Sequence, residues 1–201
     1  MTEPLIPQQF IDSADLMYQW APALARPIES GVQALLACVT GGGKILLCGN
    51  GASGALAQYA AALLVGGLER ARPELPALAL GTDAVTLTAV ARRGEYVDSI
   101  AAQVRALGNT GDALVALSSD GLSVNLIRAA QAAHERDMTV IALTGRGGGE
   151  LVRQLRDTDV LIAVPPEHEH VAHIHAAHLL AINGLCEGLD QQLLGNEENR
   201  V

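Results

Sequence analysis

Short apolar runs alternate with helix-like segments along most of the chain. Five runs of about five residues, rich in Val, Ile, Leu and Ala, cover residues 44–48, 77–80, 113–117, 139–143 and 160–164. Amphipathic segments or glycine-rich turns separate them. Buried parallel strands are typically continuous apolar runs, and helical crossovers connect them. The pattern predicts an α/β fold in which helices cover both faces of a parallel sheet.

Helical spacing also marks both ends of the chain. Residues 5–40 are predicted to form two helices, with Pro27 in the first turn of the second and the glycines at 41–43 ending it. A last helix is predicted over residues 170–193. We interpret residues 1–201 as a single domain. It has N-terminal helices at 1–40 for packing or oligomerisation, an α/β core at 44–190 and a polar tail at 195–201.

Composition and charge exclude some classes of function. Hydrophobic residues make up 49% and aromatic residues 2%, so the core must consist mainly of Ala, Leu, Val and Ile. The net charge of -9 argues against direct binding to nucleic acid or to an anionic membrane. Cys38, Cys48 and Cys186 lack C-x-x-C spacing and are interpreted as small buried hydrophobic residues. No signal-peptide pattern and no apolar run of about 20 residues occurs, which predicts a cytoplasmic protein.

Two strand-to-helix turns carry candidate chemistry. In a parallel sheet, ligands bind where strand ends meet helix starts. The first turn, CGNGASG at 48–54, combines glycines with Ser53, which could cap the helix or donate its hydroxyl to a phosphate. The second, SSDGLS at 118–123, offers three hydroxyls, those of Ser118, Ser119 and Ser123. Capped turns without a ligand are the alternative, but two such loops at neighbouring strand ends favour an anion site.

A third turn, TGRGGG at 144–149, is predicted to be a flexible connector in which Arg146 could add positive charge. Asp120 is the unfavourable residue, because a carboxylate in the serine loop would repel a phosphate by ~1–4 kcal/mol. Either Asp120 points away as a cap, or the loop binds phosphate weakly.

The two loops and Leu143-Thr144-Gly145 resemble the phosphosugar-binding signature of SIS domains. The overall likeness to these domains covers nearly the whole chain. The likeness is to the branch that holds the phosphoheptose isomerases and the DnaA initiator-associating proteins. Residues 72–91, 103–108 and 178–190 look closest to the initiator-associating group. The resemblance implies a flavodoxin-like three-layer sandwich with a five-stranded parallel sheet, and a homotetramer with ligand sites near subunit interfaces. It implies phosphosugar binding by Asn50, Gly51, Ser53, Ser118, Ser119 and Ser123.

The isomerase motifs of that branch are incomplete here. Its C-G-N-G-G-S-x-x-D-A-x-H-x-x-x-E motif places the aspartate, histidine and glutamate on Leu56, Tyr59 and Leu63. Its later Q-E-x-H motif places the glutamine on His175 and the histidine on His178, and a second, metal-binding histidine on Asn183. Leucine and asparagine cannot carry the proton that the isomerase must move. We therefore predict that the chain has no catalytic residue and no cofactor.

Five histidines lie within eleven residues: His168, His170, His173, His175 and His178. Pairs three residues apart could bind a metal ion, but no carboxylate or cysteine completes a set. We interpret them as exposed or interface histidines and predict no metal site.

The leading hypothesis is a non-catalytic tetramer that bridges DnaA-type initiator molecules, with Leu193 and Leu194 as the partner contact. The alternative for these leucines is that they complete the packing of the last helix. Two other functions stay open. One is a phosphoheptose isomerase acting on sedoheptulose 7-phosphate, and the other is a regulator that senses a phosphosugar.

Overall fold

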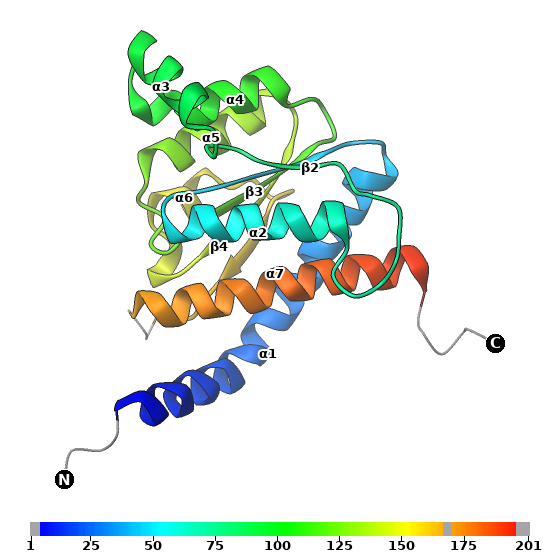
Figure 1. Cartoon of the computed structure of the whole chain (residues 1–201), viewed down its shortest axis with the longest axis vertical. Coiled ribbons are helices and arrows are strands. Elements are labelled where there is room, and N and C mark those ends of the chain that lie inside the picture. Colours follow the sequence, from blue (N-terminus) through cyan, green and yellow to red (C-terminus); the bar gives the residue numbers. More distant parts are fainter. Residues whose placement is uncertain (1–4, 167–169, 196–201) are drawn as a thin grey trace.

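The computed structural model describes residues 5–166 and 170–195, and a parallel sheet lies at its centre (Figure 1). Its strands are β1 (Ile45–Gly49), β2 (Ala77–Ala79), β3 (Ala113–Ser118), β4 (Thr139–Thr144) and β5 (Val160–Ala163). They pair in the order β2-β1-β3-β4-β5, which is the flavodoxin-like order. Every predicted run forms a strand whose ends lie within one residue of the prediction, so the predicted fold class is confirmed.

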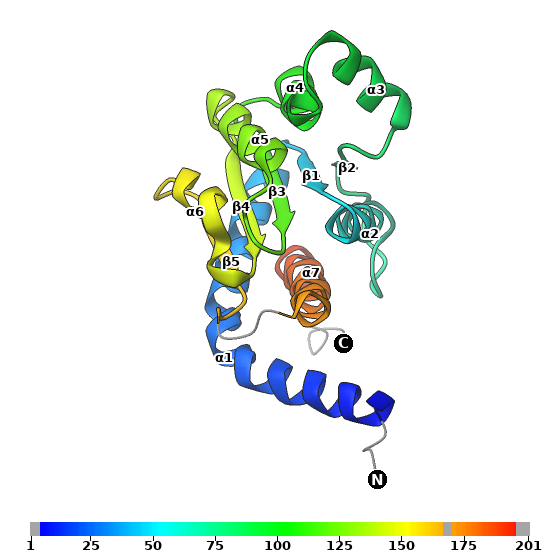
Figure 2. The same ribbon diagram turned by 90° about the vertical axis from the view of Figure 1, so that its left-hand side faces the viewer.

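Helices cover both faces of the sheet (Figure 2). They are α1 (Leu5–Thr40), α2 (Ala52–Gly66), α3 (Ala84–Arg93), α4 (Ser99–Leu107), α5 (Val124–Glu135), α6 (Gly149–Gln154) and α7 (Val171–Leu194). Two short 3-10 turns are η1 (Tyr96–Asp98) and η2 (Arg146–Gly148). Helices α1, α2 and α7 share one hydrophobic core with the sheet, and α4, α5 and α6 share the other.

Alternate strand residues supply these two cores. Leu47 and Val115 point to the side of α1, α2 and α7, whereas Leu46 and Leu114 point to the opposite side. The three cysteines are free and buried, as predicted. Burial raises the pKa of the Cys48 thiol to about 12, and that of Cys186 to about 12 as well. Both thiols are therefore uncharged packing groups near neutral pH.

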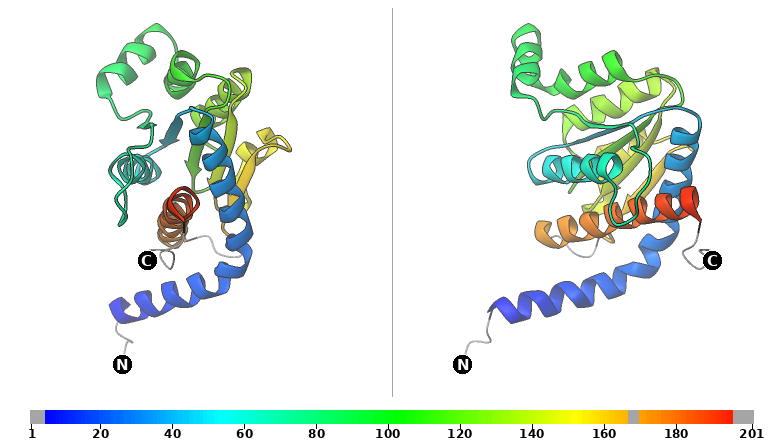
Figure 3. Two further views of the ribbon diagram at one scale, coloured as in Figure 1. Left: turned by 90° about the vertical axis from the view of Figure 1, so that its right-hand side faces the viewer. Right: turned by 45° about the vertical axis from the view of Figure 1, so that its right-hand side comes forward.

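The two predicted N-terminal helices are joined into one helix, α1, of 36 residues. It contains Pro22 and Pro27 and changes direction along its length (Figure 3). Proline removes one helical hydrogen bond and bends a helix without necessarily ending it. The C-terminal part of α1 packs on α7 and β5, while the N-terminal part projects from the domain.

The projecting part of α1 exposes several large apolar side chains among polar ones. Its large exposed side chains are Leu5, Ile6, Phe10, Ile11 and Tyr18. Despite its length, neither α1 nor any other helix within residues 5–166 and 170–195 is both long and apolar enough to cross a membrane.

A buried ion pair joins the segment after α2 to α7. The guanidinium of Arg72 contacts the Asp190 carboxylate, and both side chains are almost fully buried. Arg72 also donates to the backbone carbonyls of Leu63 and Leu64, at 2.9 and 2.8 Å. These bonds compensate the charge of Arg72, and they hold α2 against α7 next to the sheet.

Removing one partner of this pair should be strongly destabilising. We expect Asp190→Ala to lower the free energy of unfolding by about 3–5 kcal/mol, because it leaves a buried guanidinium without its counter-charge. Urea denaturation measures the loss. The control is Glu150→Ala, which breaks the exposed Arg153–Glu150 pair (2.8 Å) and should cost less than about 1 kcal/mol. Equal losses in the two variants would contradict a structural role for the Arg72–Asp190 pair.

Candidate functional site

The loops after β1 and β3 lie side by side at the carboxyl edge of the sheet. Gly49, the last residue of β1, pairs with Leu117 near the end of β3. From β1 the chain continues to β2 on one side, and β3 lies on the other. Ligands of open parallel sheets bind at such a switch point. The structure therefore brings the two predicted loops together, as expected.

A reciprocal pair of amides ties the loops to each other. The Asn50 side chain donates to Asn125 Oδ1 at 2.9 Å, and the Asn125 side chain donates to Asn50 Oδ1 at 2.8 Å. Asn125 is buried in the first turn of α5. The sequence analysis included Asn50 in the site but missed Asn125. The signal available was an amide two residues after Ser123, at the start of the predicted helix.

The first loop turns sharply into α2. Gly51 precedes the helix with φ +54°, a left-handed conformation that favours glycine, and no side chain caps α2. Ser53 lies inside the first turn of the helix and is buried, so its hydroxyl does not act as the cap. Its Oγ instead lies 3.5 Å from Nε2 of His175 on α7.

The second loop is held by its own side chains. The Ser118 hydroxyl accepts from the Gly121 N–H at 2.9 Å and donates to Asp120 Oδ1 at 3.3 Å. The same carboxylate oxygen of Asp120 accepts from the Leu122 N–H at 3.0 Å. Asp120 thus stabilises its own turn and does not cap α5, which has no side-chain cap. Ser119 is half-buried, and Ser123 occupies the N-cap position of α5 without capping it.

The third turn is packed against the serine loop, so the prediction of a flexible connector is wrong. A Cβ atom at Gly121 would lie 1.7 Å from the carbonyl oxygen of Gly148. The Leu151 N–H donates to the Gly121 carbonyl at 2.9 Å. Arg146 belongs to this turn and is exposed, with φ +50°.

Two neutral histidines of α7 differ in their surroundings. His178 is buried beside the end of β4, and neither of its ring nitrogens forms a hydrogen bond of ordinary geometry. Burial lowers the pKa of His178 to about 4. Burial also lowers the pKa of His175, which is partly exposed beside Ser53. Both imidazoles are therefore uncharged at neutral pH in the free protein.

Within residues 5–166 and 170–195, the other histidines form no metal site with these two. The rings of His170 and His173 pack on each other with centroids 4.8 Å apart at the start of α7. His168 lies outside the described residues. Among the described residues, no group of three His, Cys, Asp or Glu side chains could hold a metal ion.

The positions that correspond to the isomerase motifs form a neutral contact between α2 and α7. The Tyr59 hydroxyl donates to Asn183 Oδ1 at 2.9 Å. Leu63, half-buried, packs against the core one turn after Tyr59. The isomerase resemblance implies a metal ion, which in that branch is zinc. Such an ion does not fit these residues, since leucine has no donor atom and the Asn183 oxygen is already hydrogen-bonded.

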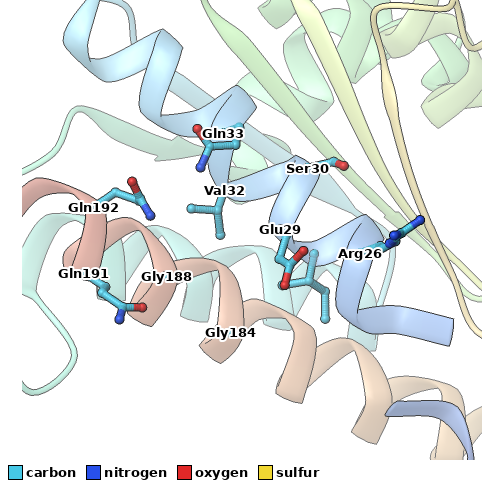
Figure 4. Close-up of a pocket in the computed structure, with 10 residues that line it drawn as sticks. Arg26, Glu29, Ser30, Val32, Gln33, Gly184, Gly188, Gln191 and Gln192 are labelled. Atoms are coloured by element: carbon cyan, nitrogen blue, oxygen red, sulfur yellow. The ribbon is translucent and has the colours of Figure 1, made fainter. Parts of the chain in front are cut away.

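A groove of about 650 Å³ lies elsewhere, between α1 and α7 (Figure 4). Gly184 and Gly188 of α7 allow close approach to α1, and a Cβ atom at Gly188 would lie 2.6 Å from Val32. Charged and amide side chains, including Arg26, Glu29 and Gln192, line its rim. The groove runs along the helices rather than at the strand ends, so the loops remain the candidate site.

The two leucines predicted to contact a partner differ in exposure. Leu193 is half-buried and packs against the core, which agrees with the packing alternative for this residue. Leu194 is exposed at the end of α7. Most of the predicted polar tail, from residue 196 onward, lies outside the described residues.

Comparison with known proteins identifies the relatives of this chain. The sequence pattern of the SIS domain matches residues 9–145. A phosphoheptose isomerase of Methylibium petroleiphilum is 51% identical over 98% of both chains. The structure is similar to the phosphoheptose isomerases of Neisseria gonorrhoeae and Francisella tularensis. The first has a TM-score of 0.86 and 42% identity over 92% of this chain and 97% of that one. The second has a TM-score of 0.88 and 38% identity over 92% of this chain and 96% of that one.

These relatives contradict the leading hypothesis of the sequence analysis. Full-length relatives at this identity are named phosphoheptose isomerase, which supports an enzyme better than a non-catalytic protein that bridges DnaA-type initiator molecules. The findings also give no support to a closer likeness to the initiator-associating group. The hypothesis gave three local substitutions, Tyr59, Leu63 and Asn183, more weight than likeness along the entire chain.

The close packing of the third turn on the serine loop can be tested at Gly121. We expect Gly121→Ala to destabilise the protein by more than Gly111→Ala. Both glycines have positive φ, +67° and +86°, so alanine costs about 1–2 kcal/mol of backbone strain at each. Only at Gly121 does the new methyl group also collide with another loop, whereas nothing lies within 4 Å at Gly111. Urea denaturation of both variants measures the difference, and equal losses would contradict the packing.

Proposed function

This chain belongs to the SIS-domain family, and on that basis we propose that it binds a phosphorylated sugar at the loops after β1 and β3 and isomerises a phosphoheptose. The observation that carries the proposal is the joined pair of loops at the switch point, in a chain whose full-length relatives are named phosphoheptose isomerase. The substrate we propose is sedoheptulose 7-phosphate.

The phosphate would be bound by neutral donors. The uncapped start of α2 and the hydroxyls of Ser53, Ser119 and Ser123 lie around the switch point. Backbone N–H groups at a helix start and serine hydroxyls both donate to anionic oxygens. Asn50 would be fixed by Asn125 rather than free to move, and Ser118 would act mainly by shaping its loop.

The reaction would move a proton from the carbon next to the carbonyl of the open sugar to the carbonyl carbon itself, and a second proton between their two oxygens, with no net oxidation. Such a transfer needs an acid–base group within reach of those carbons. Because Leu63 and Asn183 occupy the positions of the branch's glutamate and second histidine, the proton carrier would differ from that of the resemblance.

The same two residues favour a second candidate function. A protein with this phosphate site but without proton carriers would bind a phosphosugar and release it unchanged, as a sensor does. The hydrogen bond between Tyr59 and Asn183 is the specific observation in its favour, because it occupies a side chain at a catalytic position.

A paired assay separates the two functions. Purified protein is tested for calorimetric binding and for turnover of sedoheptulose 7-phosphate, with and without added zinc, beside a known phosphoheptose isomerase. Binding with turnover supports the proposal. Binding without turnover supports the sensor and removes the isomerase. Absence of binding at millimolar ligand contradicts both.

The position of the phosphate can be tested with two serine variants. We expect Ser123→Ala to weaken binding of sedoheptulose 7-phosphate roughly 10- to 100-fold, the usual effect of losing one hydrogen bond to a charged group. Ser30→Ala, in the groove between α1 and α7, should leave the affinity unchanged. The opposite pattern in calorimetry would place the ligand in the groove.

We also propose that the protein is a homotetramer. The large apolar side chains exposed on the projecting N-terminal half of α1 support association, since exposed apolar patches commonly mark interfaces.

Light scattering tests this association. We expect the wild type to have four times the mass of one chain and Phe10→Asp to reduce that mass, because it places a charge in the apolar face. Val85→Asp changes an equally exposed apolar residue of α3 and should leave the mass unchanged. A monomeric wild type would contradict the proposal.

A further inference from the structure

His175 faces the first loop of the proposed phosphate site. Its Nε2 lies 3.5 Å from the hydroxyl oxygen of Ser53, although the two residues are 122 positions apart in the chain. The contact arises because α2 and α7 pack side by side on the same face of the sheet. A phosphate oxygen that accepts from Ser53 would therefore be within hydrogen-bonding reach of the imidazole.

Positive charge is scarce around these loops. Neither the segment 48–54 nor the segment 118–123 contains a lysine or arginine. The one ionised side chain in these segments is Asp120, which carries the same sign as the ligand. Arg146 is on the neighbouring turn and is exposed. A dianion bound at the loops would thus lack a buried positive partner unless a neutral group became charged.

We propose that His175 contacts the phosphate group of the ligand and takes up a proton as the ligand binds. The inference rests on the proposed phosphosugar site and adds to it a residue that would select for an anionic ligand. The phosphosugar-binding motif does not supply this group, because the branch has a glutamine at the position of His175. An imidazolium offers a charge-assisted hydrogen bond that a glutamine amide cannot.

None of the neighbouring charged and titratable groups keeps the His175 imidazole protonated before the ligand binds. On its own helix lie His173 and His178, with His170 at the N-cap, and Cys186, Glu187 and Asp190 follow three turns or more along the same helix. From α2, the only such group is Tyr59, and β4 has none. The serine loop contributes Asp120, which is bonded within its own turn. The charged and titratable residues of α1 are Asp12, Asp15, Tyr18, Arg26, Glu29 and Cys38. Burial alone, and none of these charges, accounts for the lowered pKa of His175.

The direction in which affinity changes with pH follows from the neutral His175 imidazole of the free protein. The free imidazole has a pKa below its ordinary value, and a bound phosphate dianion would raise it. Between the free and the bound pKa, binding takes up a proton, so affinity rises as pH falls through that window. Above the bound pKa the advantage is lost. Below about pH 6 the phosphate itself becomes a monoanion, so the comparison belongs above that pH.

The matched variants are His175→Gln and His173→Gln. His175→Gln places the glutamine of the isomerase branch at the site and removes the titration. His173→Gln removes a histidine of the same helix that packs on His170 instead of facing Ser53. The affinity for sedoheptulose 7-phosphate is measured by calorimetry from pH 6.5 to 8.5. The same titrations in buffers of different ionisation enthalpy give the number of protons taken up.

We expect the wild type and His173→Gln to bind about threefold more tightly at pH 6.5 than at pH 8.5, relative to His175→Gln, for a pKa raised by about one unit from a free value below the ordinary one. Both should take up a fraction of a proton that His175→Gln does not. Equal pH profiles and equal proton uptake in all three proteins would overturn the role of His175. Absence of binding in the wild type at every pH would instead remove the phosphosugar site itself, so the two failures are distinguishable.

Discussion

The register between β1 and β3 is the constraint on which the site depends. Gly49 lies opposite Leu117, so strands β1 and β3 end at the same level of the sheet and the loops that follow them meet. The amides of Asn50 and Asn125 then join the loops through two hydrogen bonds. A shift of one residue in this pairing would turn the alternating side chains of β3 to the wrong faces and separate the amides. Packing of the third turn against Gly121 holds the second loop from its other side.

The strands and the two loops could be predicted because their signals are local. A strand buried on both faces is an unbroken apolar run, and each loop carries its glycines and serines within seven residues. The bend of α1 was harder to predict from the sequence, since Pro27 is equally consistent with the start of a second helix. The contacts that define the site are long-range. Asn50 and Asn125 are 75 residues apart, and Ser53 and His175 are 122 apart. Only the folded arrangement of α2, α5 and α7 brings these partners together.

The comparison with relatives shows that substitutions at a few motif positions are weaker evidence about function than identity along the whole chain. Leu63 and Asn183 are real departures from the isomerase motifs, and the Tyr59–Asn183 hydrogen bond shows that this region forms an ordinary helix contact. They do not outweigh 51% identity over nearly the full length of a phosphoheptose isomerase. The two observations concern different parts of one site. The loops that would bind the phosphate keep most of the family's glycines and serines, with Asp120 as an exception, whereas the positions that would move the proton do not match. Ligand binding is therefore the property on which the account as a whole depends.

The most direct test of that property is a crystal structure of the protein with sedoheptulose 7-phosphate. The account predicts that the phosphate lies between the loops after β1 and β3, within hydrogen-bonding distance of the Ser53 hydroxyl and the His175 imidazole. A phosphate bound in the groove between α1 and α7, with the two loops empty, would contradict it.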